Sequence, residues 1–459
     1  MSKEVVITGI GAVSALGVGV QPLWEGLCAG KTGLRPITRF DAQGFPSKLA
    51  GEVENFSARD LVPKSYRKAV KVMARDIELA VGAAMEAVSD AGLITRAALD
   101  LEADPASASK LTIPSARMGC HIGAGLISAD ADELAAAMVT SKDDTTGEFD
   151  KARWGKSGME NLTPLWMLKY LPNMVACHVT IIHGACGPSN TITCAEASGL
   201  LSIGESLRVI QRNDADLCFC GGAESKVNLM GLLRMDFAGR LAPTPAEATD
   251  GSSVVRPYDP NATGGLLGEG AGLLILESKQ SATARNARVY AEVVGFGSAH
   301  SPRRPSYRGQ RGIAADFNPA EPDEGFEFAI ANALDDAKLS ASDIDAVVTL
   351  GSGVPSVDLG EAGALKRVFG PHLPNIEIVT VGPNIGNCMA GIGGLLAAVA
   401  TKAVSEQKLP ARLNAGSPVE GLRAGPAPAR SAKLRHVLAV SSSLGGQNAA
   451  IILRPARGT

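Results

Sequence analysis

Apolar strands and helices alternate along this chain of 459 residues, and the alternation limits its possible folds more than any other feature. The run at 5–14 is apolar and broken by glycines, as in a strand buried on both faces. Further strands are expected over 118–125, 216–224, 344–351, 376–382, 436–443 and 448–453, and helices over 65–91, 326–337, 361–369 and 391–405. The pattern predicts a mostly parallel sheet with covered faces, and the similar halves indicate an internal duplication.

Composition narrows the class of protein further. A formal net charge of −3 gives no electrostatic reason to expect nucleic acid or an anionic membrane surface as a partner. No stretch reaches the roughly 18 to 20 consecutive apolar residues of a membrane-spanning helix. The N-terminus leads directly into a strand, with no signal peptide. We therefore expect a cytoplasmic protein whose partners are proteins and small molecules.

One segment carries a recognisable catalytic pattern. Residues 187–199 read GPSNTITCAEASG. This segment resembles the nucleophile elbow of the β-ketoacyl-acyl-carrier-protein synthases, which reads roughly G-P-S-x-x-x-x-T-A-C-x-S-G. Counting from either end places Glu196 at the position of that family's cysteine.

Other family landmarks occur in family order, at 7–17, 256–259, 267–272 and 443–449. The resemblance implies the α/β thiolase-like fold. In that fold two βαβαβαββ halves stack as a five-layer α-β-α-β-α sandwich, and two subunits form a dimer by pairing their sheets. We place the N-terminal half at 1–278 and the C-terminal half at 279–459. A polar segment at about 130–165 is expected to be a surface insertion that forms a lid or a subunit contact.

The resemblance also implies which residues should carry the chemistry. The family uses a thiolate at a helix N-terminus, two histidines and an orienting lysine. In this chain the first histidine position is Leu350, the second is Asn387, and the lysine position is Gly382. None of these side chains titrates near neutrality, so the resemblance implies that the chain has no condensing activity by itself.

The gate of the acyl site is altered as well. The family's gating segment reads G-F-G-G, and here Leu444, Gly445 and Gly446 take the places of its last three residues. Glu196 has two open interpretations: it fills the nucleophile position structurally, or it takes part in acid-base chemistry. Cys194 is a candidate displaced nucleophile, although a small buried hydrophobic residue is the favoured interpretation.

A short basic segment contains Arg303, Arg304, Arg308 and Arg311. Acyl carrier proteins are acidic, so this segment is either a docking patch for them or a solvated loop. The six histidines show no spacing typical of metal ligands, and the glycine-rich segments lack the pattern of a nucleotide site. We expect no metal and no cofactor.

These observations favour a chain-length-factor subunit, a non-catalytic member of the family that pairs with an active ketosynthase. The elbow and the insertion would line the tunnel for an acyl or polyketide chain delivered by acyl carrier protein, in polyketide, polyene or fatty-acid assembly. One alternative is a free-standing acyltransferase of the family that uses Cys194 or Glu196 in altered chemistry. Another is a non-catalytic acyl-binding homodimer.

Overall fold

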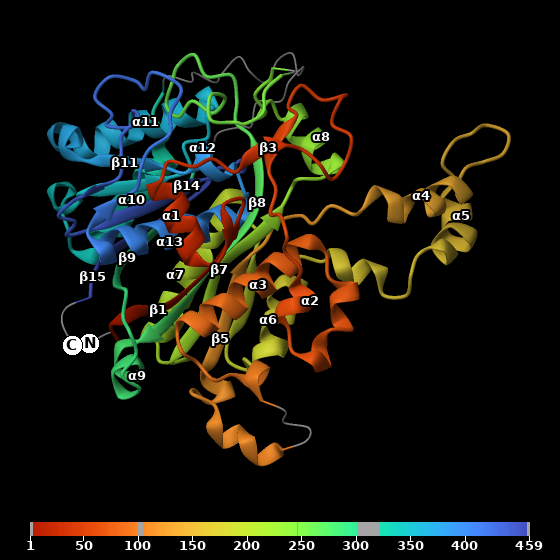
Figure 1. Ribbon diagram of the computed structural model, residues 1–459, viewed down its shortest axis with the longest axis horizontal. Coiled ribbons are helices and arrows are strands. Elements are labelled where there is room, and N and C mark those ends of the chain that lie inside the picture. Colours follow the sequence, from red (N-terminus) through yellow and green to blue (C-terminus); the bar gives the residue numbers. More distant parts are fainter. Residues whose placement is uncertain (1–2, 100–103, 246, 302–320, 457–459) are drawn as a thin grey trace.

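The computed structural model describes residues 3–99, 104–245, 247–301 and 321–456 (Figure 1). In the described part of the chain, one large sheet runs in the order β11-β10-β14-β15-β9-β1-β8-β7-β5-β6. The strands of its first half are β1 (Val5–Ser14), β5 (Met118–Gly123), β6 (Ser189–Ile192), β7 (Leu217–Ser225) and β8 (Leu267–Ser278). Those of its second half are β9 (Ala291–His300), β10 (Ala346–Thr349), β11 (Glu377–Thr380), β14 (Val437–Ser442) and β15 (Gln447–Pro455).

The two halves repeat one topology. In the first, β5 is parallel to β6 and β7, and β8 is antiparallel to β7 and β1. In the second, β10 is parallel to β11 and β14, and β15 is antiparallel to β14 and β9. The duplication and the thiolase-like fold are therefore confirmed. The limits 1–278 and 279–459 stay a prediction.

The prediction of a mostly parallel sheet is wrong in one respect, because the sheet is mixed. Strands β8 and β15 each return antiparallel beside the preceding strand, and the halves join where β1 and β9 pair antiparallel. A short turn joins β14 to β15, as antiparallel neighbours allow, whereas parallel neighbours need a crossover. The longer connection from β7 to β8 contains a helix, Leu229–Phe237. The sequence pattern of apolar runs is the same in both cases.

Helices form layers on both sides of each half. The outer helices are α3 (Arg75–Asp90) and α6 (Met174–His183) in the first half, and α10 (Glu324–Ala337) and α11 (Pro355–Phe369) in the second. Between the halves lie α7 (Ser198–Gln211) and α13 (Ala390–Glu406), which contact each other. Helix α13 is buried along nearly its whole length, as expected for a central helix.

The helix expected over 65–91 is shorter than predicted. Two 3-10 turns, Lys64–Tyr66 and Ala69–Val72, precede it, and α3 begins only at Arg75. Residues Met73 and Ala74 are extended, and the side chain of Arg75 is held by Glu269. A tertiary ion pair thus fixes the start of the helix.

Shorter elements complete the fold. The strands are β2 (Gly17–Val18), β3 (Leu34–Pro36), β4 (Leu49–Gly51), β12 (Lys408–Leu409) and β13 (Arg430–Ser431). The helices are α1 (Val20–Cys28), α2 (Ala58–Leu61), α8 (Leu229–Phe237), α9 (Lys279–Ala284) and α12 (Gly382–Ile385).

The segment expected to be an insertion projects from the body as an arm (Figure 1). It contains α4 (Ala131–Thr140), α5 (Lys151–Arg153) and a π-helical turn, Trp154–Gly158. The side chains of Val139, Leu165 and Met167 are 66%, 67% and 64% exposed. Its role as a lid or a subunit contact stays a prediction.

Candidate functional site

The elbow predicted from the sequence is a sharp turn between β6 and α7. Ala195 has a φ of +46°, in the left-handed region that residues other than glycine rarely adopt. The backbone N–H of Cys194 donates to Ser198 Oγ at 2.7 Å, across the turn. The 3-10 turn Ala195–Ala197 then continues into α7, so Glu196 lies at the N-terminal end of that helix.

The carboxylate of Glu196 is buried and both of its oxygens accept a hydrogen bond. Oε1 accepts from Asn387 Nδ2 at 3.0 Å, and Oε2 accepts from the backbone N–H of Leu444 at 3.0 Å. The amide of Asn387 is oriented because its Oδ1 accepts the backbone N–H of Met389 at 2.8 Å. The carboxylate therefore joins the elbow to two segments that are distant in sequence.

A small cavity adjoins this carboxylate. Its volume is about 30 Å³, which holds about one water molecule. Glu196, Leu350 and Asn387 all line it, so the structure brings together the positions predicted for the nucleophile and both histidines. Ser441, Ser442, Ser443, Arg240 and Glu361 also line it.

Gly382 does not line the cavity. Its backbone N–H donates to the carbonyl of Leu350 at 2.7 Å. A Cβ at this position would lie 2.4 Å from the carbonyl oxygen of Gly351. The backbone has closed the space from which a lysine side chain would start.

The predicted gate residues form the turn between β14 and β15. Gly446 has a φ of +86°, and its N–H donates to the carbonyl of Ser443 at 3.0 Å. Leu444 is partly buried against an apolar cluster that includes Leu241 and Leu267. The bond from Leu444 N–H to Glu196 holds this turn against the elbow.

One buried acid at the cavity was not predicted from the sequence. Glu361 of α11 lies among hydroxyl groups: its Oε2 accepts from Tyr258 at 3.1 Å and Thr349 at 3.4 Å, and its Oε1 accepts from Ser442. It forms no ion pair with the residues that the structure describes. Burial, followed by repulsion from Asp358, raises the pKa of Glu361 to about 8. In the sequence, the only indication of this buried acid was its spacing of three residues from Asp358 on an otherwise apolar helix face.

The other predicted candidates lie apart from this cavity. Cys194 is partly buried and is not one of the lining residues, and burial raises the pKa of its thiol. Arg303, Arg304, Arg308 and Arg311 lie outside the described residues.

In 3–99, 104–245, 247–301 and 321–456, no group of three or more His, Cys, Asp or Glu could hold a metal ion. No helix within the same ranges has the length and apolarity needed to cross a membrane.

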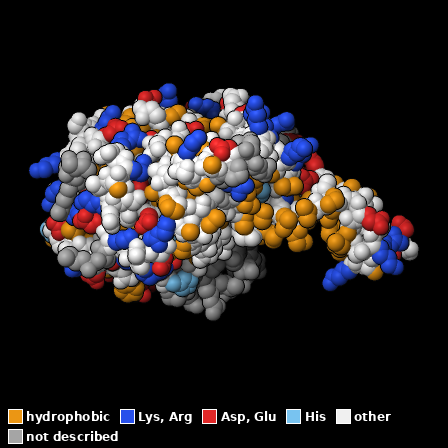
Figure 2. Space-filling model, turned by 90° about the horizontal axis from the view of Figure 1, so that it is seen from below, with side chains coloured by type: hydrophobic (Ala, Val, Ile, Leu, Met, Phe, Trp, Pro, Cys, Tyr) orange, Lys and Arg blue, Asp and Glu red, His pale blue; other side chains and the backbone are white. Residues whose placement is uncertain are grey.

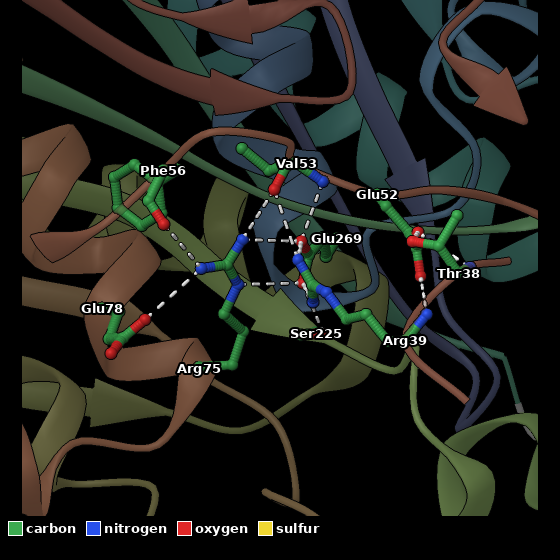
Figure 3. Close-up of polar contacts among 9 residues, drawn as sticks. All are labelled: Thr38, Arg39, Glu52, Val53, Phe56, Arg75, Glu78, Ser225 and Glu269. Atoms are coloured by element: carbon green, nitrogen blue, oxygen red, sulfur yellow. Dashed lines mark hydrogen bonds and ion pairs between the residues drawn. The ribbon is translucent and has the colours of Figure 1, made fainter.

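A much larger, open cleft of about 1170 Å³ lies between the start of α3 and the base of the arm. Arg39 and Arg75 line it, and both bind the fully buried carboxylate of Glu269 (Figure 3). Arg39 Nη2 lies 2.5 Å and Arg75 Nη2 lies 2.9 Å from Glu269 Oε1. Burial alone would raise the pKa of Glu269, but the hydrogen bonds from the two arginines outweigh it and lower the pKa.

Comparison with known proteins identifies the family. The model "Beta-ketoacyl synthase, N-terminal domain" matches residues 2–282, and "Beta-ketoacyl synthase, C-terminal domain" matches residues 290–416. The chain belongs to the beta-ketoacyl synthase family. Among the curated family members, 3-oxoacyl-[acyl-carrier-protein] synthase 2 of Staphylococcus aureus (strain COL) is 30% identical over 99% of this chain and 98% of its own length. The enzyme of the same name from Coxiella burnetii (strain RSA 493) is 31% identical, with 98% of each chain covered.

Solved structures of ketosynthases share the fold. The ishigamide ketosynthase/chain length factor has a TM-score of 0.79 and 28% identity, and both chains are covered completely. A type II polyketide ketosynthase solved with its acyl-carrier protein, AntDE:AntF, has a TM-score of 0.79 at 23% identity, again over the whole of both chains. At that identity the likeness concerns the fold alone.

Proposed function

We propose that this chain is a non-condensing beta-ketoacyl synthase subunit of the chain-length-factor type, which pairs with an active ketosynthase. The observation that carries this proposal is the position and hydrogen bonding of the Glu196 carboxylate. Its carboxylate occupies the nucleophile position and accepts one hydrogen bond at each oxygen. A carboxylate held in this way cannot form the thioester that the family's cysteine forms.

The surroundings of Glu196 support the same function. Leu350 and Asn387, at the two histidine positions, can neither take up a proton near neutrality nor carry an imidazolium charge. A cavity of about 30 Å³ leaves no room for an acyl chain. We therefore assign the tunnel wall to the open cleft at the base of the arm.

The arm supplies the surface that a partner subunit would cover. Figure 2 shows apolar side chains gathered on the arm and on the body beside its base. Exposed apolar residues there include Leu126, Val139, Leu165, Met167 and Met230. Strand β6 is the edge of the sheet, and Ser189 and Asn190 on it are exposed. An exposed apolar surface and an open strand edge are each typical of subunit interfaces.

A basic surface beside the cleft suits the acidic carrier protein. Four exposed basic residues lie on or between the two 3-10 turns that precede α3: Lys64, Arg67, Lys68 and Lys71. Complementary charge speeds association and fixes orientation. We propose this surface as a docking site for acyl carrier protein, in addition to the arginines at 303–311.

The test is to assay the purified chain alone and together with an active ketosynthase from the same source. Alone, the chain should release no carbon dioxide from malonyl carrier protein and should not become acylated. With the ketosynthase it should form a stable one-to-one complex and change the length of the product. Turnover by the isolated chain that disappears in Glu196→Gln or Cys194→Ala variants would instead establish the free-standing enzyme.

The molar mass of the complex distinguishes the third possibility, an acyl-binding homodimer, from a heterodimer with the ketosynthase. Multi-angle light scattering of the mixture should show the heterodimer. A homodimer that persists in the presence of the ketosynthase would contradict our proposal.

A further inference from the structure

Three arginines converge on one carboxylate at the outer edge of the second half. Glu377 begins β11, the edge strand, at the opposite end from Gly382. Its Oε1 lies 2.7 Å from Arg423 Nη2, and its Oε2 lies 2.5 Å from Arg412 Nη1 and 2.6 Å from Arg430 Nη2. Within the described residues these arginines form no other ion pair. Two positive charges are therefore left without a counter-charge.

Backbone pairing holds the three arginines in place. The N–H of Ile378, next to Glu377, donates to the carbonyl of Arg423 at 3.1 Å. The N–H of Arg412 donates to the carbonyl of Ala427 at 2.8 Å. Arg430 lies in β13, which pairs with β12. Because the backbone fixes these positions, the cluster is organised before any ligand arrives.

The three side chains differ in their access to solvent. Arg412 is 8% exposed, whereas Arg423 is 51% and Arg430 is 33% exposed. Burial lowers the pKa of Arg412, and repulsion from Arg430 and Arg423 lowers it further. One carboxylate engages only part of the N–H donors of three guanidinium groups, so Arg423 and Arg430 keep donors for a second anion. The negative charge of that anion would relieve the repulsion among the arginines.

We propose that Arg423 and Arg430 form a binding site for an oxyanion of the phosphate class, organised by Glu377 and Arg412. A guanidinium presents its N–H donors in a planar fork that matches two oxygens of a phosphate. Arg412 is too buried to reach such a ligand and acts by holding Glu377. Inorganic phosphate and a phosphate monoester share this chemistry.

Isothermal titration calorimetry of the full chain tests the site, with inorganic phosphate and glycerol 3-phosphate at constant ionic strength. We expect one saturable phosphate site per chain. Equal affinities would indicate free phosphate as the ligand, and tighter binding of glycerol 3-phosphate would indicate a phosphate ester. Absence of saturable phosphate binding would overturn the proposal.

Variants separate a ligand site from a structural ion cluster. Arg423→Gln and Arg430→Gln should each weaken phosphate binding at least fivefold. Glu377→Gln should also weaken it, because Arg423 and Arg430 then lose the carboxylate that orients them, whereas a purely structural cluster would lose stability with no effect on phosphate binding. Arg435→Gln is the matched control: its side chain is also 51% exposed, but Asp345 neutralises it. Equal weakening in this control would contradict the assignment.

Discussion

At the residue scale, the side chains and backbone predicted to stand at the reactive positions of a ketosynthase bind one another. Glu196 accepts a hydrogen bond from the side-chain amide of Asn387, and Leu444 contributes only its backbone N–H. Gly382 contributes no side chain, and its backbone bonds to Leu350. Restoring a single catalytic side chain would therefore leave its neighbours in the wrong arrangement.

Glu361 gives the first prediction, because its pKa of about 8 lies far above the ordinary value of 4.5. Between these values the folded state keeps a proton that the unfolded state releases. Its contribution to the free energy of unfolding is therefore present below about pH 4.5 and is lost as the pH rises, by up to about 1.4 kcal/mol per pH unit. Glu361→Gln, which cannot titrate, should show a smaller fall in Tm between pH 5 and pH 8.

The measurement is thermal unfolding of both proteins across that range at constant ionic strength. Several charged or titratable groups lie near Glu361: Asp358, Tyr258, Asp323, Arg240 and Glu196. Glu25→Gln, at an exposed position of α1, is the control and should leave the pH dependence unchanged. Parallel curves for the wild type and Glu361→Gln would show that the carboxyl group is already ionised at neutral pH.

At the element scale, the close crossing of α7 and α13 sets the position of the elbow. A Cβ on Gly199 would lie 2.6 Å from the backbone nitrogen of Gly394 and 3.0 Å from the carbonyl oxygen of Ala390. Both obstacles are backbone atoms of α13, which is buried between the two halves and has little room to move. Since Gly199 is three residues from Glu196, this packing fixes where the carboxylate lies.

We predict that Gly199→Ala destabilises the fold by roughly 1 to 3 kcal/mol, because overpacking exceeds the gain in helix propensity. Chemical denaturation monitored by circular dichroism measures the effect. Gly155→Ala in the arm is the control, since a Cβ there would meet nothing within 4 Å. Equal stability of the two variants would mean that α7 and α13 can separate without cost.

At the scale of the whole molecule, the body is closely packed while the arm exposes apolar side chains. Three buried clusters account for most of the interior, one between the halves and one on each outer face. Val139 and Met167 of the arm are 66% and 64% exposed and have no such environment. Under the proposed function, the arm is therefore the part of the chain that a partner subunit would cover.

We predict that the double variant Val139→Thr, Met167→Gln weakens subunit association at least tenfold, while the stability of the isolated chain changes by less than about 0.5 kcal/mol. Sedimentation velocity over a dilution series measures the association. Phe328→Gln on the outer helix α10 is the matched control, because its side chain is 55% exposed but lies away from the arm. An interface elsewhere would be indicated if the arm variant associated as strongly as this control.

The sequence by itself determined the duplicated fold, and it predicted which residues stand at each reactive position. It did so because strand and helix periodicities are local, and because the elbow places Glu196 within one short segment. The tertiary structure alone decided that Glu196 is paired, that Glu361 lies at the same cavity, and that β8 and β15 make the sheet mixed. The partners of Glu196 lie 191 and 248 positions away, and one of them is a backbone N–H that any residue type could supply. Contacts of that kind leave no pattern in the sequence, because they depend on which distant backbone segments the fold brings together.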